Sequence, residues 1–266
     1  MIGAGIKIYR RLRFLGHAMG VAALFWCLGL AAATDAYAAG AKTDDLTLNQ
    51  KKAFEQVIRQ YLLENPEIIA EAIKALQKKR EIAEANAARA ALNSQRNALF
   101  NDPDSPIAGN KNGDVTVVEF FDYRCGVCKR VHPIVDTLMN GDRKLRRVYK
   151  DWPILGPDSV FAARAALASR AQGKYLEFHN AMMEAKGRLN KNTVLAIARR
   201  VGIDHRRLSR NMDSAEITKI LRRNYQLAES LKLNGTPSFV IGDKILKGGR
   251  DLETMRQIVA ETRAAK

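Results

Sequence analysis

Two cysteines separated by two residues follow closely on a run of β-branched and aromatic residues, and this arrangement constrains the fold more than any other feature. Residues 115–121 read Val-Thr-Val-Val-Glu-Phe-Phe, which predicts a buried central strand. Cys125-Gly126-Val127-Cys128 comes next and is expected to open a helix. A disulfide across two residues closes too small a loop to stabilise a fold much, so the pair is interpreted as reactive rather than structural.

The rest of the chain after residue 100 predicts an α/β domain. Residues 101–113, rich in Asn, Asp, Pro and Gly, are interpreted as a linker. The expected elements are a second strand over 144–149, helices in pieces over 158–233, and a hairpin of strands 238–241 and 244–246. Breaks in the helical region are expected near 173, 187–192 and 202–204, and Asp251 is expected to cap a last helix.

The two cysteines are expected to have different roles in disulfide exchange. Cys125 should lie at the start of the helix, where unpaired N–H groups and the helix dipole favour a thiolate and lower the pKa from ~8.5 to between ~3.5 and ~7.5. Cys128, one turn later, should face inward and resolve the mixed disulfide. The alternative is half of a zinc or copper site with His132 as third ligand, although the chain has no second cysteine pair to complete it. No cofactor and no metal are expected.

Four further residues are candidates for the same site. Pro133 is expected to kink the helix, the alternative being that the helix ends there. Glu119, a lone acid in an apolar strand, is expected to be buried and to exchange a proton with Cys128; alternatively it points to water at a strand edge. Pro237, if its peptide bond were cis, would present the unpaired backbone of Thr236 to a substrate strand.

Residues 1–38 are interpreted as a signal peptide that is removed on export. An apolar run from about 21 to 33 follows a positive start that contains Lys7, Arg10, Arg11 and Arg13. Ala36-Tyr37-Ala38 has small residues at the two positions that a signal peptidase reads, so cleavage is expected after Ala38. The alternative, an uncleaved membrane anchor, conflicts with an apolar run shorter than the ~20 residues that span a bilayer.

Residues 39–100 are expected to form a helical segment that self-associates. Thr47 to Gln50 fits a capping box, and apolar residues then recur on one face (Phe54, Val57, Ile58, Tyr61 and Leu62). Asn65-Pro66 is expected to restart the helix, with Asn65 as its N-cap and Pro66 at its first position. One helical layer cannot cover its own apolar stripe, so it must pack on the main domain or on copies of itself; copies are favoured.

The chain is strongly basic. Residues 1–38 carry four basic residues and one acidic residue, so their removal lowers the formal charge from +16 to +13. Nucleic acid is the usual partner of such a charge, but an exported protein rarely meets it, and no partner of this class is expected. The charge is interpreted as a solvated surface, the alternative being attraction to acidic clients or to a membrane surface.

Together the motifs resemble the DsbA-like thioredoxin-fold family of thiol:disulfide oxidoreductases. The resemblance covers residues 114–266 and rests on Glu-Phe-Phe-Asp-Tyr-Arg-Cys-Gly-Val-Cys-Lys, Trp-Pro-Ile-Leu-Gly-Pro at 152–157 and Gly-Thr-Pro-Ser-Phe at 235–239. It implies a thioredoxin-like domain over 101–266 with 158–233 as its helical insertion. It also implies a cis Pro237 packed on the cysteines, Cys125 as nucleophile, Cys128 as resolving thiol and Glu119 as buried acid.

A second resemblance concerns the N-terminal segment. Residues 47–80, with Leu-Glu-Asn-Pro-Glu-Ile-Ile at 63–69, are similar to the N-terminal segment of the suppressor of copper sensitivity C proteins. Those relatives use the segment to oligomerise, in some cases as trimers. The resemblance therefore implies a homo-oligomer formed through residues 39–100.

The residues around the cysteines favour one direction of reaction. Strongly oxidising DsbA enzymes carry Pro-His between the cysteines, whereas this chain has Gly126-Val127 and lacks that histidine. Threonine before Pro237 resembles the isomerases of the family. We therefore expect a periplasmic disulfide isomerase or reductase that acts on unfolded or misfolded exported proteins and has a membrane redox partner. The alternatives are a DsbA-like oxidase and a copper-binding thiol protein.

Overall fold

The structure, a computed structural model, describes residues 46–265. The expected signal peptide and its cleavage site after Ala38 lie outside these residues. These residues divide into two compact units, the first ending at Ala72 and the second beginning at Ile73. Across the described part of the chain, no helix combines the length and the apolar character needed to cross a bilayer.

The first unit contains α1, Leu48–Glu64, which begins at the predicted capping box. The Thr47 side chain accepts the Gln50 N–H, and the Gln50 side chain accepts the Thr47 N–H at 2.9 Å. The expectation that Asn65 caps the next helix is wrong. Its side-chain amide donates to the Tyr61 carbonyl at 2.9 Å, so Asn65 ends α1 instead, and α2, Glu67–Ser94, begins after Pro66.

The apolar face of α1 is open to solvent. No residue of α1 is buried, and the predicted stripe is more than half exposed at Phe54 (55%), Val57 (64%), Ile58 (57%) and Tyr61 (55%). A contiguous exposed apolar face of this kind is typical of a surface that binds a partner.

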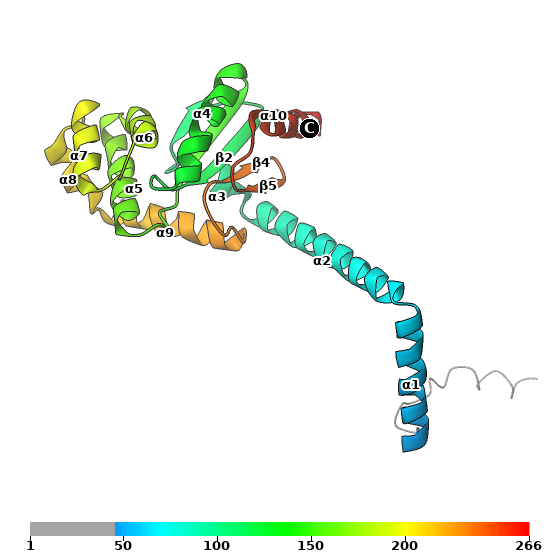
Figure 1. Cartoon of the computed structure of the whole chain (residues 1–266). Coiled ribbons are helices and arrows are strands. Elements are labelled where there is room, and N and C mark those ends of the chain that lie inside the picture. Colours follow the sequence, from blue (N-terminus) through cyan, green and yellow to red (C-terminus); the bar gives the residue numbers. More distant parts are fainter. Residues whose placement is uncertain (1–45, 266) are drawn as a thin grey trace, which may run out of the picture. The chain divides into compact units, whose positions relative to one another are not determined.

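The second unit is built on a mixed five-stranded sheet of order β1-β3-β2-β4-β5 (Figure 1). Its strands are β1 Ile107–Gly109, β2 Val115–Phe121, β3 Leu145–Asp151, β4 Ser238–Ile241 and β5 Lys244–Lys247. β2 and β3 are parallel, and the other three pairs are antiparallel. The predicted central strand 115–121 is therefore confirmed, and the β4–β5 hairpin turns at Gly242, whose φ of 61° suits glycine.

Helices cover both faces of this sheet. The helices of the second unit after α2 are α3 Arg96–Phe100, α4 Gly126–Gly141, α5 Pro157–Ser169, α6 Tyr175–Glu184, α7 Lys191–Arg200, α8 His205–Met212, α9 Ala215–Ser230 and α10 Leu252–Ala264. Val117 faces a core formed with α4 and α10, and its neighbour Val118 faces a core formed with α3 and α9. This alternation follows from the two-residue period of a strand. Leu92, near the end of α2, is buried in the core that Val118 forms with α3 and α9, so this part of the helix packs on the domain.

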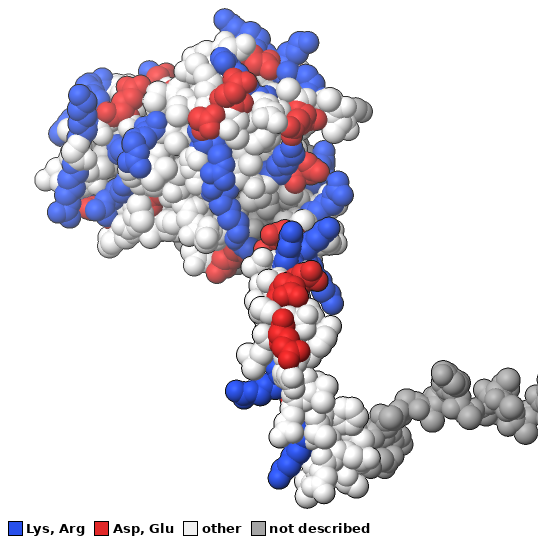
Figure 2. All heavy atoms as spheres, turned by 45° about the vertical axis from the view of Figure 1, so that its right-hand side comes forward, with Lys and Arg blue, Asp and Glu red and all other residues white. Residues whose placement is uncertain are grey.

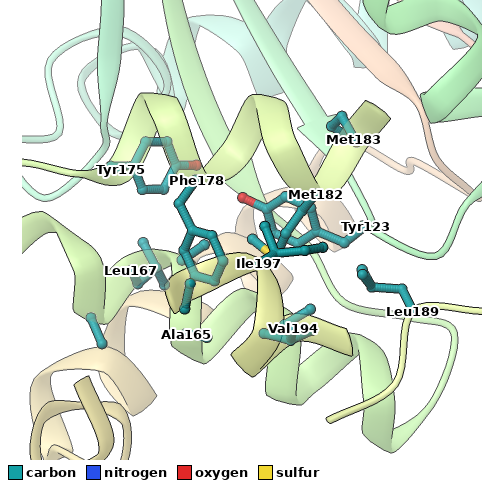
Figure 3. Packing of buried hydrophobic residues seen from close by; sticks show 14 of the residues in the cluster. Tyr123, Ala165, Leu167, Tyr175, Phe178, Met182, Met183, Leu189, Val194 and Ile197 are labelled. Atoms are coloured by element: carbon teal, nitrogen blue, oxygen red, sulfur yellow. The ribbon is translucent and has the colours of Figure 1, made fainter. Parts of the chain in front are cut away.

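The helical insertion forms a third core beside the sheet. Helices α5 to α8 gather on one side of the domain (Figure 1), and side chains such as Phe178, Met182 and Val194 pack between them (Figure 3). The same cluster includes Tyr123, Cys125 and Cys128, so the cysteines lie where the insertion meets the sheet. The predicted breaks near 173, 187–192 and 202–204 are all present between helices.

The segment interpreted as a linker contains a strand. Ile107 pairs with Val148 and Gly109 with Arg146, so β1 extends the sheet beyond β3. Asp102 also fastens this segment to the domain, because its carboxylate accepts a hydrogen bond from the buried Lys150 at 3.0 Å. The same ammonium group donates to the Ala98 carbonyl of α3 at 2.7 Å. Apart from this strand, the thioredoxin-like arrangement expected from the sequence is the one observed.

Candidate active site

Cys125 is the N-cap of α4, as the sequence predicts. Its φ and ψ of −71° and 113° are extended, and its Sγ accepts the backbone N–H of Cys128 at 3.3 Å. An oxygen at this position would cap the helix in the same way, so the sulfur occupies a site that favours negative charge. Only 7% of Cys125 is exposed, which is less than expected for a reactive cysteine.

The surroundings of Cys125 favour its thiolate. The hydrogen bond from the Cys128 thiol makes the largest contribution to lowering the pKa of Cys125. Hydrogen bonds from the Thr236 side chain and from the N–H groups of Cys128 and Val127 lower it further. Burial opposes these bonds, yet together they lower the pKa of Cys125 from 9.0 to about 5. The thiolate is thus stabilised without a histidine between the cysteines.

Cys128 has the opposite character. It is fully buried, and this burial, together with its hydrogen bond to Cys125, raises the pKa of Cys128 far above its ordinary range. Both cysteines are free thiols in this structure. One sulfur is therefore suited to attack, and the other must lose its proton before it can react.

Asp122, to which the sequence analysis gave no role, organises the turn before the cysteines. It is buried, and its Oδ1 accepts the Arg124 N–H at 2.7 Å and the Ser159 hydroxyl at 2.8 Å. Its Oδ2 accepts the N–H groups of Ile154 and Leu155 at 2.8 and 3.0 Å. One carboxylate thus ties the cysteine turn to the 152–157 segment and to α5. The position of Asp122, directly after a strand and before the cysteines, could have indicated this role from the sequence.

The Thr236–Pro237 peptide bond is cis, as the family resemblance implies. The Thr236 carbonyl is not unpaired, contrary to the expectation, because it accepts a hydrogen bond from the Cys125 thiol at 3.2 Å. The Pro237 carbonyl accepts the N–H of Gly248 at 2.9 Å, which joins this turn to the end of β5. The predicted substrate-binding segment therefore lies beside the sulfur of Cys125.

Glu119 lies in the interior, not at a strand edge facing water. It is 1% exposed, and its Oε2 accepts two hydrogen bonds from Arg147, from Nε at 3.0 Å and from Nη2 at 2.6 Å. Arg147 also lies over the ring of Tyr149, 4.6 Å from its centroid. Sequence reasoning missed Arg147, since a charged residue in a predicted strand gave no sign that it points inward.

Pro133 and His132, two residues that the sequence singled out, both lie within α4. The helix continues through Pro133 to Gly141, so it does not end at the proline; the kink stays a prediction. His132 is buried, and its Nε2 lies 3.2 Å from the Asp136 carboxylate. Within residues 46–265, no three His, Cys, Asp or Glu side chains are grouped as metal ligands, so the zinc or copper alternative lacks a ligand set there.

A further residue of α4, Lys129, joins the cysteine helix to the insertion. Its ammonium group donates to the carbonyls of Met182 at 2.6 Å, Ala185 at 2.9 Å and Met183 at 3.3 Å. These carbonyls lie at the end of α6, where a cation is favourable. The contact fixes the insertion against the helix that carries both cysteines.

Two families of known proteins match this chain. The family model described as "DSBA-like thioredoxin domain" matches residues 116–260, which is more than half of the chain. The model described as "Copper resistance protein ScsC N-terminal domain" matches residues 50–83. The two matches fall on the domain that holds the cysteines and on the segment that contains the exposed face of α1.

Solved structures show the same similarity. A thioredoxin-like oxidoreductase from Silicibacter pomeroyi DSS-3 is 48% identical over 64% of this chain and 99% of its own, with a TM-score of 0.63. Proteus mirabilis ScsC in a transitional conformation is 31% identical over 85% of this chain and 100% of its own, with a TM-score of 0.62. A periplasmic thioredoxin-like protein from Salmonella enterica serovar Typhimurium is 29% identical over 65% and 97%, with a TM-score of 0.60.

Similarity also extends to part of some longer proteins. The Na(+)/H(+) antiporter NhaA 1 of Salinispora arenicola is 27% identical over 59% of this chain. The chain spans only 25% of the length of that antiporter.

Proposed function

Since this chain belongs to the DSBA-like thioredoxin-domain family, we propose that it is a thiol:disulfide oxidoreductase that acts through Cys125 and Cys128. The observation that carries the proposal is the position of Cys125 at the N-cap of α4, with a pKa lowered to about 5. Such a sulfur is a thiolate at neutral pH and can attack a disulfide. Cys128, buried one turn later, supplies the second thiol that resolves the mixed disulfide.

The substrates we propose are unfolded or misfolded exported proteins. Thr236 lies beside the Cys125 sulfur, and its backbone is suited to bind an extended client segment next to the disulfide. The Thr236 carbonyl is released when the Cys125 thiol ionises, because a thiolate has no hydrogen to donate. Attack and substrate binding would then be favoured by the same ionisation.

Disulfide isomerisation or reduction is the direction we propose. The support is the absence of a histidine between the cysteines and the threonine before Pro237. Oxidation is the second candidate, because the low pKa of Cys125 stabilises the reduced form and makes a couple more oxidising. The redox state in cells separates the two. Mostly reduced cysteines support the isomerase or reductase, whereas mostly oxidised cysteines support an oxidase linked to a membrane redox partner.

The test of the activity compares the parent chain with Cys125→Ser and Cys128→Ser. The parent should accelerate reduction of the interchain disulfides of insulin by dithiothreitol and should reactivate ribonuclease that has scrambled disulfides. Cys125→Ser should lose both activities, and Cys128→Ser should trap clients as mixed disulfides. Equal rates for the parent and Cys125→Ser would rule out the proposed function.

A periplasmic location is part of the proposal. One similar structure is described as periplasmic, and residues 1–38 have the pattern of a signal peptide. Fractionation of cells that express the chain should place it in the periplasm with Ala39 as its first residue. Recovery of the uncleaved chain in the membrane fraction would instead support the anchor.

Self-association through residues 39–100 completes the proposal. The exposed face of α1 gives the physical reason, and the match of residues 50–83 to the ScsC N-terminal domain agrees with it. Several Cys125 sites facing one client would raise the local thiol concentration and favour repeated exchange. Figure 2 shows one face of the molecule, on which Lys and Arg side chains are interspersed with Asp and Glu.

A further inference from the structure

Three charged side chains connect the interior beside the cysteines to solvent. Arg147 on β3 donates to Glu119 on β2, and its Nη1 donates to Asp136 on α4 at 2.8 Å. The side chains of Glu119 and Arg147 are 1% and 2% exposed, whereas that of Asp136 is 36% exposed. Glu119, Arg147 and Asp136 therefore form a row of charges that leads from a fully buried carboxylate through a buried guanidinium to a carboxylate in contact with water.

Two pockets meet at Asp136. One, of about 540 Å³, is lined by Asp136 and also by Arg147 and Tyr149. The other, of about 530 Å³, is lined by Asp136 together with His132 and Lys129. Nδ1 of the buried His132 has no hydrogen-bond partner, and its Nε2 lies 3.2 Å from the Asp136 carboxylate, so polar atoms line the second pocket. Solvent thus reaches Asp136 from two sides.

The net charge of Glu119, Arg147 and Asp136 decides whether Glu119 can accept a proton. Glu119 and Arg147 alone form a neutral pair, and protonation of Glu119 would leave a buried guanidinium without a counter-charge. Removing one partner from a buried ion pair in this way is strongly unfavourable. Asp136 adds a second carboxylate and brings the net charge of the group to −1. One proton can then enter while Arg147 keeps a counter-ion.

We propose that Asp136 is a positioning residue for the resolving step: acting through Arg147, it allows Glu119 to accept the proton of Cys128, which then leaves to solvent at the Asp136 pockets. This inference rests on the proposed thiol–disulfide exchange and assigns a residue to it. Glu119 is close enough to Cys128 for its charge to contribute to the raised pKa of that thiol.

The resolving step is an intramolecular thiol–disulfide exchange. Cys125 is joined to a client sulfur in a mixed disulfide, and the Cys128 thiol gives its proton to the Glu119 carboxylate. The Cys128 thiolate attacks Cys125 Sγ; the Cys125–Cys128 bond forms, the bond to the client breaks, and the client sulfur leaves with the electron pair. The two cysteines are oxidised and the client is reduced by two electrons. Glu119 then returns its proton to water.

Other titratable groups pack around this row without replacing Asp136. They are Asp122 and Tyr123 after β2, Tyr149 on β3, Lys129 and His132 on α4, and His179 and Glu184 on α6. Burial lowers the pKa of both histidines and raises that of Tyr149 to about 12, so these three are neutral near pH 7. Lys129 is occupied by the α6 carbonyls, and Asp122 by the cysteine turn. Asp136 is the acid bonded to Arg147 on the solvent side.

The experiment uses the reduced full chain and an aromatic disulfide, 5,5′-dithiobis(2-nitrobenzoate), and follows the released thiol. The first release reports attack by Cys125. The second, whose rate does not depend on reagent concentration, reports resolution by Cys128. Rates are measured against pH for the parent and for Asp136→Asn, Asp136→Glu and Asp142→Asn. Asp142 is the matched control, because it lines the same pocket but is paired with Arg263.

For Asp136→Asn we expect the second release to slow about tenfold at pH 7 and its pH profile to move down by about one unit, because the group of buried charges loses a negative charge and binds a proton less readily. The first release should match the parent, which also shows that the variant is folded. Asp136→Glu should restore most of the second rate, and Asp142→Asn should behave as the parent. A parental second-release profile in Asp136→Asn, or an equal change in Asp142→Asn, would overturn the inference. A parent whose Cys125 releases no thiol would instead refute the proposed function, and this inference with it.

Discussion

The Cys125 thiol donates a hydrogen bond to the Thr236 carbonyl at 3.2 Å, which joins the N-cap of the cysteine helix to the residue before the cis proline. When the thiol ionises this bond is lost. The donors that remain around the sulfur are the N–H groups of Cys128 and Val127 and the hydroxyl and thiol side chains of Thr236 and Cys128. The thiolate is therefore held by hydrogen-bond donors of the fold rather than by a charged neighbour.

The reactivity of Cys125 should follow its low pKa. Since the pKa is about 5, the thiolate predominates above that pH and is lost as the pH falls through it. Alkylation of the reduced chain by iodoacetamide should be constant above about pH 6 and should decrease about tenfold per unit below about pH 5. Mass spectrometry should find the label on Cys125 and not on the buried Cys128. A midpoint near pH 8.5, as in a free cysteine, would contradict this expectation.

Replacement of Thr236 by valine should raise the pKa of Cys125. The valine keeps the shape of the side chain and removes the hydroxyl that favours the thiolate, so the alkylation midpoint should move up by about half a unit to one unit. The matched control is Ser238→Ala, which removes a nearby hydroxyl that is bonded to the Gly235 carbonyl. If both variants shift the midpoint equally, the Thr236 hydroxyl has no specific effect.

Asp122 should be important for stability as well as for the site. Asp122→Ala leaves two part-buried backbone N–H groups of the 152–157 segment without their acceptor, and the expected loss is about 2–4 kcal/mol of unfolding free energy, measured with urea on the reduced chain. Asp158→Ala is the control. Asp158 forms a partly exposed ion pair with Arg188 at 3.6 Å, and its loss should cost less than about 1 kcal/mol. Similar losses in the two variants would show that Asp122 has no special role.

Much of the fold could be predicted where a residue pattern is local. The strand 115–121 is apolar and β-branched because it is covered on both faces, and Cys125 begins a helix because the chain leaves that strand in a short turn. The helix breaks were predictable from residues such as Gly173, whose φ of 67° ends a helical turn. These features depend on neighbours in sequence.

Other features depend on partners far away in the chain. β1 is a strand only because Ile107 pairs with Val148, and its three residues have no period to detect. Arg147 looks like a surface residue of a strand until its partner Glu119 is known, and the same holds for Lys150 with Asp102. A buried charge is acceptable only with a partner, and a sequence does not show which distant residue provides it.

The exposed face of α1 is expected to be the contact between copies of the chain. If this face binds copies of the chain, a charge placed in it should prevent assembly, because burying an unpaired charge costs more than the contacts gain. Ile58→Glu should therefore convert an oligomer into a monomer, as measured by light scattering on the mature chain, while the alkylation of Cys125 stays unchanged. Arg59→Glu, one position along and outside the stripe, is the control and should leave the mass of the assembly as it is. A parent that is already monomeric at micromolar concentration would show that the face binds a different partner, and an oligomeric Ile58→Glu would place the interface elsewhere.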